Sequence, residues 1–461
     1  MSAKDPVDTD RAWSYADALH AIWARSDFER GRVANPFVDA EAGERGLRRV
    51  AALLDRLGCP QDRFAAVHIA GSKGKGSTAA ILAAILGAAG HRPGLFTSPH
   101  LHTVRERIVV AGEAISEERF AALTARVEQA AAALERDHPA LGPISTFEIL
   151  TALALLAFAD AGCPLAVIEV GLGGTYDATN VLSPLVAVIT RLDLEHTAIL
   201  GDSLAAIAAA KAGIIKSGQT VLVAPQSAAA LAVIAAVATD RGSPLLVGDR
   251  DWRLAGDWRN FTAIGPWGRL SCMRLALSGA HQMENAGLAL AAVWALRQAG
   301  WVIPEVAIRT GLTDVRWPGR FERVVRAGQP TFVLDGAHTP AAAAALAETL
   351  ATEMPGQQAV LVLGVSADKD LAALLHPLAP IISAVIATQA DHPRALPAAA
   401  LAAHLDCGDH PLAVVPAVGA ALTEAASRAG PAGMVLVTGS LFVVASAREA
   451  LGLAVAEPTL A

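Results

Sequence analysis

The 461-residue sequence has few cysteines and no basic cluster, and both absences narrow the classes of protein it can belong to. Its four cysteines lie far apart, without a C-x-x-C pair or a histidine at zinc-finger spacing, so neither a disulfide framework nor a structural zinc is indicated. A formal charge of −7 without any basic stretch argues against a nucleic-acid partner. This cysteine usage fits a reducing cytoplasm, which is the location we expect.

Long apolar segments are also missing. The first residues include Lys4, Asp5, Asp8 and Asp10 and lack the apolar core of a signal peptide. The uncharged run 429–447 is interrupted by a proline, glycines and serines, and we interpret it as strand, turn and helix rather than a membrane span. We therefore expect no membrane contact. With 53% hydrophobic residues, the chain is long enough for two or three domains with their own cores.

The most informative stretch is 68–78, HIAGSKGKGST, where glycines join a predicted strand at Val67–Ala70 to a predicted helix at Thr78–Ala89. Unpaired N–H groups at a helix N-terminus attract anions. Lys75 can reach the β- and γ-oxygens of a polyphosphate, and the Ser77 hydroxyl can reach phosphate or Mg²⁺. The general pattern G-x-x-x-x-G-K-[ST] is not matched, because a glycine separates this lysine from the serine. A plain strand-to-helix turn is the alternative, but the context favours phosphate binding.

Two further polar residues follow predicted strands. Leu165–Val170 is a continuous apolar run interrupted only by Glu169, just before a glycine turn. A buried carboxylate is costly without a cation, so this position predicts an Mg²⁺ ligand, with simple capping of the loop as the alternative. His196 comes after the strand predicted at Leu185–Thr190 and could point to the same crevice, although a lone loop histidine is usually a surface residue.

A lysine lies on the apolar face of the next predicted helix. Leu204, Ile207, Ala208 and Lys211 follow helical spacing. Such a lysine either extends its ammonium to solvent or is buried with a lowered pKa, and a neutral amine can react with carbon dioxide to give a carbamate. From the spacing alone, extension to solvent is favoured.

Several segments between these features have weaker patterns. Val104–Val110 alternates like a strand, which would place Arg105 and Arg107 on one face, either to bind an anionic substrate or as a solvated strand face. The strand predicted at Val221–Val223 is expected to close the sheet, and 249–277 contains short β segments.

A new pattern begins at Pro330, after the helix breakers Pro318 and Gly319. Strands predicted at 331–334, 360–365, 382–388 and 435–438 alternate with helices, which is typical of a parallel sheet with ligands at the carboxyl ends of its strands. The polar residues that stand at such ends are Asp335, His338, Asp368, Lys369 and Ser440. We therefore predict an α/β protein, with a P-loop ATPase domain containing a mainly parallel sheet at 1–312 and a smaller Rossmann-like α/β domain at 313–461.

Taken together, the motifs resemble those of the folylpolyglutamate synthase/dihydrofolate synthase family, within the Mur ligase superfamily of ATP-dependent amide-bond-forming enzymes. The resemblance extends from about Leu47 to Phe442. The motifs that carry it are, in order, GSKGKGS, TSPHL with RERI, TFE, EVGLGG with DATN, EHT with ILGDSL, KAGIIK, HQMEN, WPGR, DGAH, DKD and TGSL.

The resemblance implies roles for individual residues. ATP would be bound by Gly71, Gly74, Lys75, Gly76, Ser77, Asn285, Arg320 and Asp335. Two magnesium ions would be held through Ser98, Glu169 and His196. Substrate would be bound by Ser145, Thr146, Phe147, Glu148, Tyr176, Asp177, Ala178 and Ser440. Lys75 would be catalytic, together with Lys211 as a carbamylated lysine, against its spacing, and His338 near the incoming glutamate.

The implied chemistry is the ligation of L-glutamate to dihydropteroate or to a folate. ATP would phosphorylate a carboxylate of the acceptor, and the glutamate amino group would attack the acyl phosphate. Closure of the two domains would complete the site, in a chain expected to be a monomer.

The sequence departs from the family pattern at four positions, which obscures the choice of substrate. Thr339 replaces an asparagine, Thr175 and Tyr176 replace an arginine and an apolar residue, and Glu195 replaces an aspartate.

Two alternatives remain. A Mur-type ligase acting on a different carboxylate is one, although the cell-wall enzymes carry a nucleotide-sugar domain and only 70 residues precede Gly71 here. A nucleotide-binding regulatory module without turnover is the other, but it would not need Glu169, His196 and Lys211 together.

Overall fold

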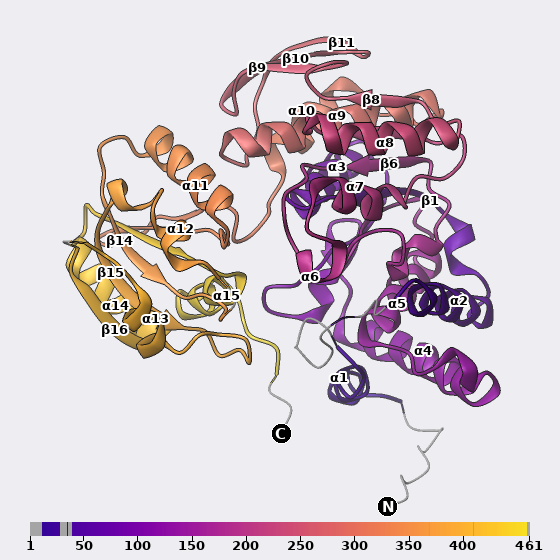
Figure 1. Ribbon diagram of the computed structural model, residues 1–461, viewed down its shortest axis with the longest axis horizontal. Helices are drawn as coiled ribbons and strands as arrows, with labels where there is room; N and C mark the ends of the chain where they lie inside the picture. Colours follow the sequence, from indigo (N-terminus) through magenta and orange to yellow (C-terminus); the bar gives the residue numbers. More distant parts are fainter. Residues whose placement is uncertain (1–11, 28–34, 36–38, 368, 409, 459–461) are drawn as a thin grey trace, which may run out of the picture.

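The structure is a computed structural model that describes residues 12–27, 35, 39–367, 369–408 and 410–458. Asp368, one of the predicted strand-end residues, lies outside the described residues. Each of two lobes is built around its own large sheet, as predicted (Figure 1). The first lobe comprises the elements from α1 to α10, and the second those from β12 to α15.

The first lobe contains an eight-stranded sheet of order β4-β3-β2-β5-β1-β6-β7-β8. At its centre β1 (Ala65–Ala70) pairs in parallel with β5 (Leu165–Glu169) and β6 (Val186–Ile189). The other parallel strands are β2 (Gly94–Phe96), β7 (Thr220–Val223) and β8 (Leu245–Val247), and the antiparallel edge consists of β3 (Ile108–Val110) and β4 (Glu113–Ala114). The predicted mainly parallel sheet is confirmed, but β8 lies beyond β7, so the expectation that Val221–Val223 closes the sheet is wrong.

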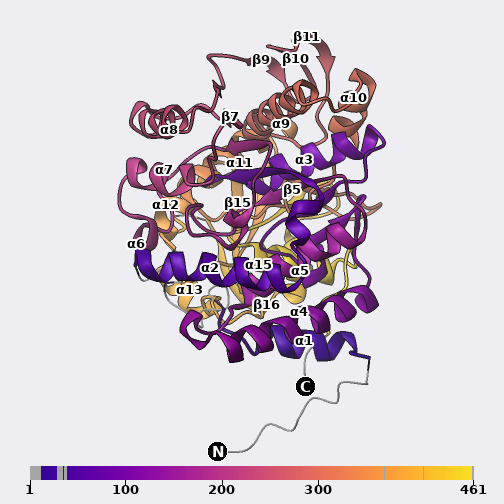
Figure 2. The same ribbon diagram turned by 90° about the vertical axis from the view of Figure 1, so that its right-hand side faces the viewer.

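Helices cover both faces of this sheet. Val67 and Ile69 of β1 face a core shared with α3 (Lys75–Ala88), α9 (Ala280–Gln298) and α10 (Glu305–Asp314). The opposite face carries two separate apolar clusters. One involves α1 (Tyr15–Trp23), α2 (Ala40–Arg56), α4 (Glu117–Asp137) and α5 (Thr146–Asp160), which Figure 2 shows together on one side of the lobe; the other involves α7 (Leu204–Ala212) and α8 (Ala228–Asp240).

A small antiparallel sheet confirms the short β segments predicted within 249–277. It consists of β9 (Arg253–Asp257), β10 (Asn260–Gly265) and β11 (Gly268–Met273). Trp252, Trp258 and Phe261 bury its inner side in the core that contains α9.

The second lobe has a six-stranded sheet of order β12-β13-β17-β14-β15-β16. Only β12 (Glu322–Val324) is antiparallel; the parallel strands are β13 (Thr331–Leu334), β14 (Ala359–Leu363), β15 (Ile382–Gln389), β16 (Leu412–Ala417) and β17 (Met434–Thr438). One face is covered by α11 (Pro340–Glu353), α12 (Leu371–Leu375) and α13 (Ala398–His404), the other by α14 (Val418–Ala429) and α15 (Leu441–Ala450). The Rossmann-like arrangement is confirmed. The sequence analysis missed β16, a largely exposed edge strand without a buried apolar run.

The strand predicted at Val104–Val110 is largely wrong. Residues Val104–Arg107 form a 3-10 helix, and only the last three residues are a strand. The carboxylate of Glu106 accepts the N–H groups of residues 101, 102 and 103, which holds the backbone in a turn. Arg105 and Arg107 therefore do not share a strand face, and Arg107 is buried, with Nε donating to His100 Nδ1 at 2.9 Å.

Among the described residues, no helix combines the length and the hydropathy that crossing a bilayer requires. The apolar run at 429–447 instead contains β17 and most of α15, as the sequence predicted.

Candidate active site

A cavity of about 1500 Å³ lies between the two lobes. The first lobe contributes the loop Gly71–Ser77, which follows β1, and Glu169 at the end of β5. The second lobe contributes Arg320 and the turn Asp335–His338, which follows β13. Parallel strands commonly place ligand-binding groups at their carboxyl ends, so the topology explains why residues far apart in sequence meet here.

Glycines shape the loop after β1 because side chains would not fit. A Cβ on Gly71 would lie 1.8 Å from Thr190 Oγ1, and one on Gly74 would lie 2.1 Å from Asn285 Oδ1. Gly74 also has a φ of 89°, which L side chains rarely adopt. The helix α3 begins at Lys75, three residues before the predicted start, so the GKGS segment itself forms the helix N-terminus with its free N–H groups.

The glycine that separates this loop from the general P-loop pattern has its own steric reason. A Cβ on Gly76 would lie 2.9 Å from Trp317 Cζ2 and 3.4 Å from Glu169 Oε2. Trp317 belongs to the segment that connects the two lobes. The first turn of α3 therefore packs tightly against the connection between the lobes.

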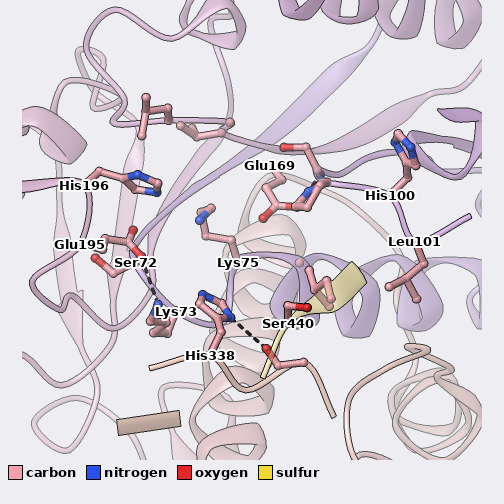
Figure 3. Close-up of a pocket in the computed structure, with 18 of the residues that line it drawn as sticks. Ser72, Lys73, Lys75, His100, Leu101, Glu169, Glu195, His196, His338 and Ser440 are labelled. Atoms are coloured by element: carbon pink, nitrogen blue, oxygen red, sulfur yellow. Dashed lines mark hydrogen bonds and ion pairs between the residues drawn. The ribbon is translucent and has the colours of Figure 1, made fainter. Parts of the chain in front are cut away.

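Glu169 is 4% exposed and faces the phosphate loop. Burial raises the pKa of its carboxyl to about 7, against the opposing effects of the Lys75 ammonium and the Ser98 N–H, which donates to Oε2 at 3.0 Å. Figure 3 shows Glu169 and Lys75 turned into the same cavity. A carboxylate so poorly solvated is well suited to a cation, which would replace the missing water.

The donor set around Glu169 suits magnesium rather than zinc. No group of three or more His, Cys, Asp or Glu side chains that could hold a metal occurs in the described part of the chain. The hydroxyls of Ser77 and Ser98 and the imidazole of His196 line the same cavity and are further candidate donors. Mg²⁺ favours oxygen ligands and usually retains substrate phosphates and waters in its shell, so these residues fit that ion.

Lys211 is 2% exposed, so the extension to solvent favoured by its spacing is wrong. Its ammonium donates to Gly71 O at 2.8 Å and lies 3.3 Å from Glu195 Oε1. Glu195 also pairs with Lys73, at 3.3 Å. Burial, with the Lys75 charge, lowers the pKa of Lys211 to about 8, against the effect of Glu195. Gly71 O and Glu195 hold the side chain of Lys211 inside the site, and helical spacing does not reveal these partners.

The carboxylate of Asp335 shapes the turn of the second lobe, accepting N–H groups from Phe321 at 2.8 Å and Ala337 at 2.9 Å. His338 Nδ1 lies 2.9 Å from Gly336 O, and this contact is the dashed line that starts at His338 in Figure 3. Burial and the Lys73 charge lower the pKa of His338 to about 4, so its ring is neutral near pH 7. With Nδ1–H donating to the carbonyl, Nε2 is an unprotonated acceptor.

At the opposite end of the cavity, the polar side chains form hydrogen bonds and an ion pair with other protein groups. Ser145 caps α5, and Glu148 accepts from Ser145 N and pairs with Arg49 at 2.6 Å. The Thr146 hydroxyl donates to Ile22 O at 3.0 Å.

Aromatic rings and a buried acid complete this end. A Cβ on Gly171 would lie 2.4 Å from the Phe147 ring, and one on Gly43 would lie 2.4 Å from the Tyr176 ring. Asp177 is buried and accepts from the backbone of Leu172 at 2.9 Å. Shape therefore defines this end more than exposed polar groups do.

All site residues predicted from the sequence line this one cavity. Ala178 and Ser440 are among them, although the Ser440 hydroxyl is used to cap α15, accepting from Val443 N at 3.1 Å. The individual roles assigned to these residues stay predictions.

The sequence analysis missed other lining residues. Lys73 carries a signal, since it lies in the glycine loop close to Lys75, and His281 and Trp317 lie in the motifs HQMEN and WPGR, whereas Arg49 belongs to no motif.

Comparison with known proteins gives consistent matches. Residues 69–293 match the Mur ligase middle domain, and residues 319–441 match the Mur ligase, glutamate ligase domain. The dihydrofolate synthase/folylpolyglutamate synthase of Mycobacterium tuberculosis is 40% identical over 77% of this chain and 76% of its own length. The folylpolyglutamate synthase of Lacticaseibacillus casei is 36% identical over 88% of this chain and 94% of its own length. The structure of the M. tuberculosis folylpolyglutamate synthase complexed with ADP superposes with a TM-score of 0.85 at 34% identity, covering 95% of this chain and 98% of that one.

Proposed function

The chain belongs to the Mur ligase family, in the branch of the folylpolyglutamate and dihydrofolate synthases, and from this premise we propose how its cavity uses ATP to join L-glutamate to a folate. The chain is an ATP-dependent ligase of this branch. The observation that carries the proposal is the single cavity in which the phosphate loop and Glu169 face Arg320, Asp335 and His338 of the other lobe.

In this proposal the ATP phosphates lie on the first turn of α3, where backbone N–H groups and Lys75 offset their charge. Asn285, Arg320 and Asp335 contact the nucleotide from α9 and the second lobe. The γ-phosphoryl group passes to a carboxylate of the acceptor, and ADP leaves. Positioning and electrostatic stabilisation supply most of the rate enhancement in such transfers.

The second half-reaction forms the amide. The amino group of L-glutamate attacks the acyl phosphate, the new C–N bond forms and inorganic phosphate leaves. His338 presents its unprotonated Nε2 in the cavity and can accept a proton or a hydrogen bond from that amine.

Magnesium belongs to this proposal as two ions held through Ser98, Glu169 and His196, with the Ser77 hydroxyl nearby. When bound, the ions neutralise charge on the phosphate oxygens during transfer. The protein's own contribution is a buried carboxylate whose ionised form requires a cation.

We also propose that Lys211 is carbamylated in the active enzyme. The lowered pKa of about 8 leaves a fraction of neutral amine, which can form an N–C bond to carbon dioxide and release a proton. Lys211→Ala should abolish turnover while the affinity for ATP stays within about threefold of wild type. Turnover that persists in this variant contradicts the carbamate role.

Two of the departures from the family pattern have structural uses. Thr339 caps α11 by accepting from Ala342 N at 3.4 Å, and the Thr175 hydroxyl donates to Ala210 O at 3.0 Å. Neither contact distinguishes folate from dihydropteroate, so the proposal includes both as acceptors. It also places the two domains at 1–312 and 313–461, in a cytoplasmic monomer with small-molecule partners.

Phosphate release tests the proposed function directly. Purified protein with ATP, Mg²⁺ and L-glutamate should release phosphate only when tetrahydrofolate or dihydropteroate is added, and mass spectrometry should detect the acceptor with one more glutamyl residue. Release that is independent of any pterin, or the absence of release with both acceptors, contradicts the proposal.

A further inference from the structure

A buried histidine lies in the strand that leads to the phosphate loop, yet it takes no part in the chemistry described above. His68 is in the middle of β1 and is fully buried. On the same face of this strand, Ala66 belongs to the apolar cluster of α4 and α5, and Ala70 to that of α7 and α8. The imidazole therefore lies between two apolar clusters, where burying a polar ring is costly unless it makes a hydrogen bond.

The ring makes one such bond. His68 Nε2 lies 2.8 Å from the hydroxyl of Thr179, which is itself fully buried. His68 Nδ1 is buried without a hydrogen-bond partner among the described residues. Burial lowers the pKa of His68 to about 3, so the ring is neutral at every working pH of the protein. The hydrogen bond to the Thr179 hydroxyl is thus the polar contact that the imidazole of His68 makes among the described residues.

The contact continues to the end of the cavity that is lined by Ser145–Glu148 and the loop 171–178, which we call the acceptor end. The Thr179 hydroxyl donates to Asp177 Oδ1, which also accepts from Thr179 N at 3.0 Å, while Asp177 Oδ2 accepts from Leu172 N at 2.9 Å. With donors directed at both oxygens, the carboxylate accepts the single proton of the threonine hydroxyl. That hydroxyl must then accept from His68, which places the histidine proton on Nε2.

This order of donors links the two ends of the cavity. It joins β1, which leads to the phosphate loop, to the loop 171–178, which lines the acceptor end. In that loop, Asp177 holds Leu172 N and thereby sets the bend that carries the Tyr176 ring between them. The hydrogen bonds from Thr179 and His68 fix the orientation of the Asp177 carboxylate.

We propose that His68 is a positioning residue for the acceptor, acting through Thr179 and Asp177 on the loop 171–178 without touching either substrate. The proposal rests on the proposed function for the identity of the acceptor. It predicts that the hydrogen bond from position 68 matters for acceptor binding and has little effect on ATP binding.

The experiment compares steady-state kinetics of full-length variants at position 68. His68→Leu removes the donor and should raise the KM for the folate acceptor about tenfold, while the KM for ATP changes by less than about twofold. His68→Gln retains an N–H donor of similar reach and should return the acceptor KM to within about threefold of wild type.

Thr179→Val removes the same contact from its other side and should reproduce the effect of His68→Leu. Because both changes interrupt the same chain of hydrogen bonds, the acceptor KM of the double variant should be at most about twofold higher than that of either single variant. Thr124→Val is the matched control, since its buried hydroxyl donates to Phe120 O at 2.7 Å within α4 and Thr124 does not line the cavity. This control should leave the acceptor KM unchanged.

Equal changes in both KM values, or an unchanged acceptor KM with only a lower Tm, overturn the proposal. Hydrogen exchange provides a readout without any substrate: His68→Leu should speed exchange in 171–178 and leave 71–77 unchanged. If wild-type protein releases no phosphate with any folate, the proposed function has failed, and the exchange result alone decides the positioning role. Equal exchange rates in 171–178 in wild type and variant then count against it.

Discussion

The two ends of the interlobe cavity differ in how their polar groups are used. At the phosphate end, Lys75 and Glu169 face the cavity, and burial raises the pKa of Glu169 to about 7 against the effect of the Lys75 ammonium. At the acceptor end, Glu148 is neutralised by Arg49 and Asp177 is held by backbone donors. The phosphate end is thus ready for ligand charge, whereas at the acceptor end the ion pair of Glu148 with Arg49 stabilises the fold and the aromatic rings define the shape of the cavity.

The largest effect should come from Lys75. Lys75→Ala is expected to lower kcat/KM by about 10³-fold, because an electrostatic partner of the transferring phosphoryl group is lost, with little change in Tm. Steady-state phosphate release and thermal unfolding check this. Lys73→Ala is the control from the same loop, since the Lys73 ammonium pairs with Glu195, and it should cost less activity. A large fall in the Tm of Lys75→Ala would show that Lys75 stabilises the fold, and it would contradict the contrast drawn between the two ends of the cavity.

At the acceptor end, Glu148→Gln should mainly reduce stability. The pair with Arg49 is largely buried, with side-chain exposures of 15% and 8%, and leaving one charge unpaired should lower the free energy of unfolding by about 3 kcal/mol. Denaturant unfolding measures this loss, and the acceptor KM should rise as well.

The pair between Arg25 and Glu128, at 2.6 Å, gives a matched control because neither residue lines the cavity. Arg25 keeps a second partner, Glu135, at 2.8 Å, so Glu128→Gln should lower stability by less than Glu148→Gln does, and it should leave the acceptor KM unchanged. If both variants raise that KM equally, the Glu148 effect is a general loss of stability.

A smaller effect, of the opposite sign, is expected at Glu169. Its folded pKa of about 7 lies above its ordinary value of 4.5, so the ionised carboxylate disfavours the folded state at pH 8. Glu169→Gln should therefore stabilise the ligand-free protein at pH 8 by on the order of 2 kcal/mol. The gain should shrink as pH falls from 7 toward 4.5 and vanish below 4.5, where the carboxyl of Glu169 is neutral in both the folded and the unfolded state. Unfolding curves at several pH values measure this gain in stability. A loss of stability of Glu169→Gln at pH 8 contradicts the interpretation that the ionised carboxylate of Glu169 disfavours folding.

The smallest effect is expected at Thr339. Thr339→Asn restores the residue usual in the family and keeps a good helix cap, so stability should change by less than about 0.5 kcal/mol. Acceptor preference, measured as the ratio of kcat/KM values for tetrahydrofolate and dihydropteroate, should stay within about twofold. A larger shift in this ratio would mean that residue 339 selects the acceptor.

The same contrast explains which predictions succeeded. The phosphate loop, Glu169 and the strand ends Asp335 and His338 could be predicted because each follows a buried strand, and parallel strands bring their ends to one edge. The 104–110 segment could not, because Glu106 closes a turn that has the same alternation as a strand. The burial of Lys211 was also missed from spacing, since its carbonyl partner on Gly71 is 140 residues away in the chain.

The sequence by itself determined most of the strands and helices, the two α/β lobes and the glycine-rich turn after β1, because these depend on local patterns of apolar residues, glycines and helix caps. Only the tertiary structure decided the partners of the buried polar groups. Glu148 meets Arg49 across 99 residues, and His68 meets Thr179 across 111. Hydrogen bonds and ion pairs act over a few ångströms in space, and no local pattern records which distant residue the fold brings within that distance.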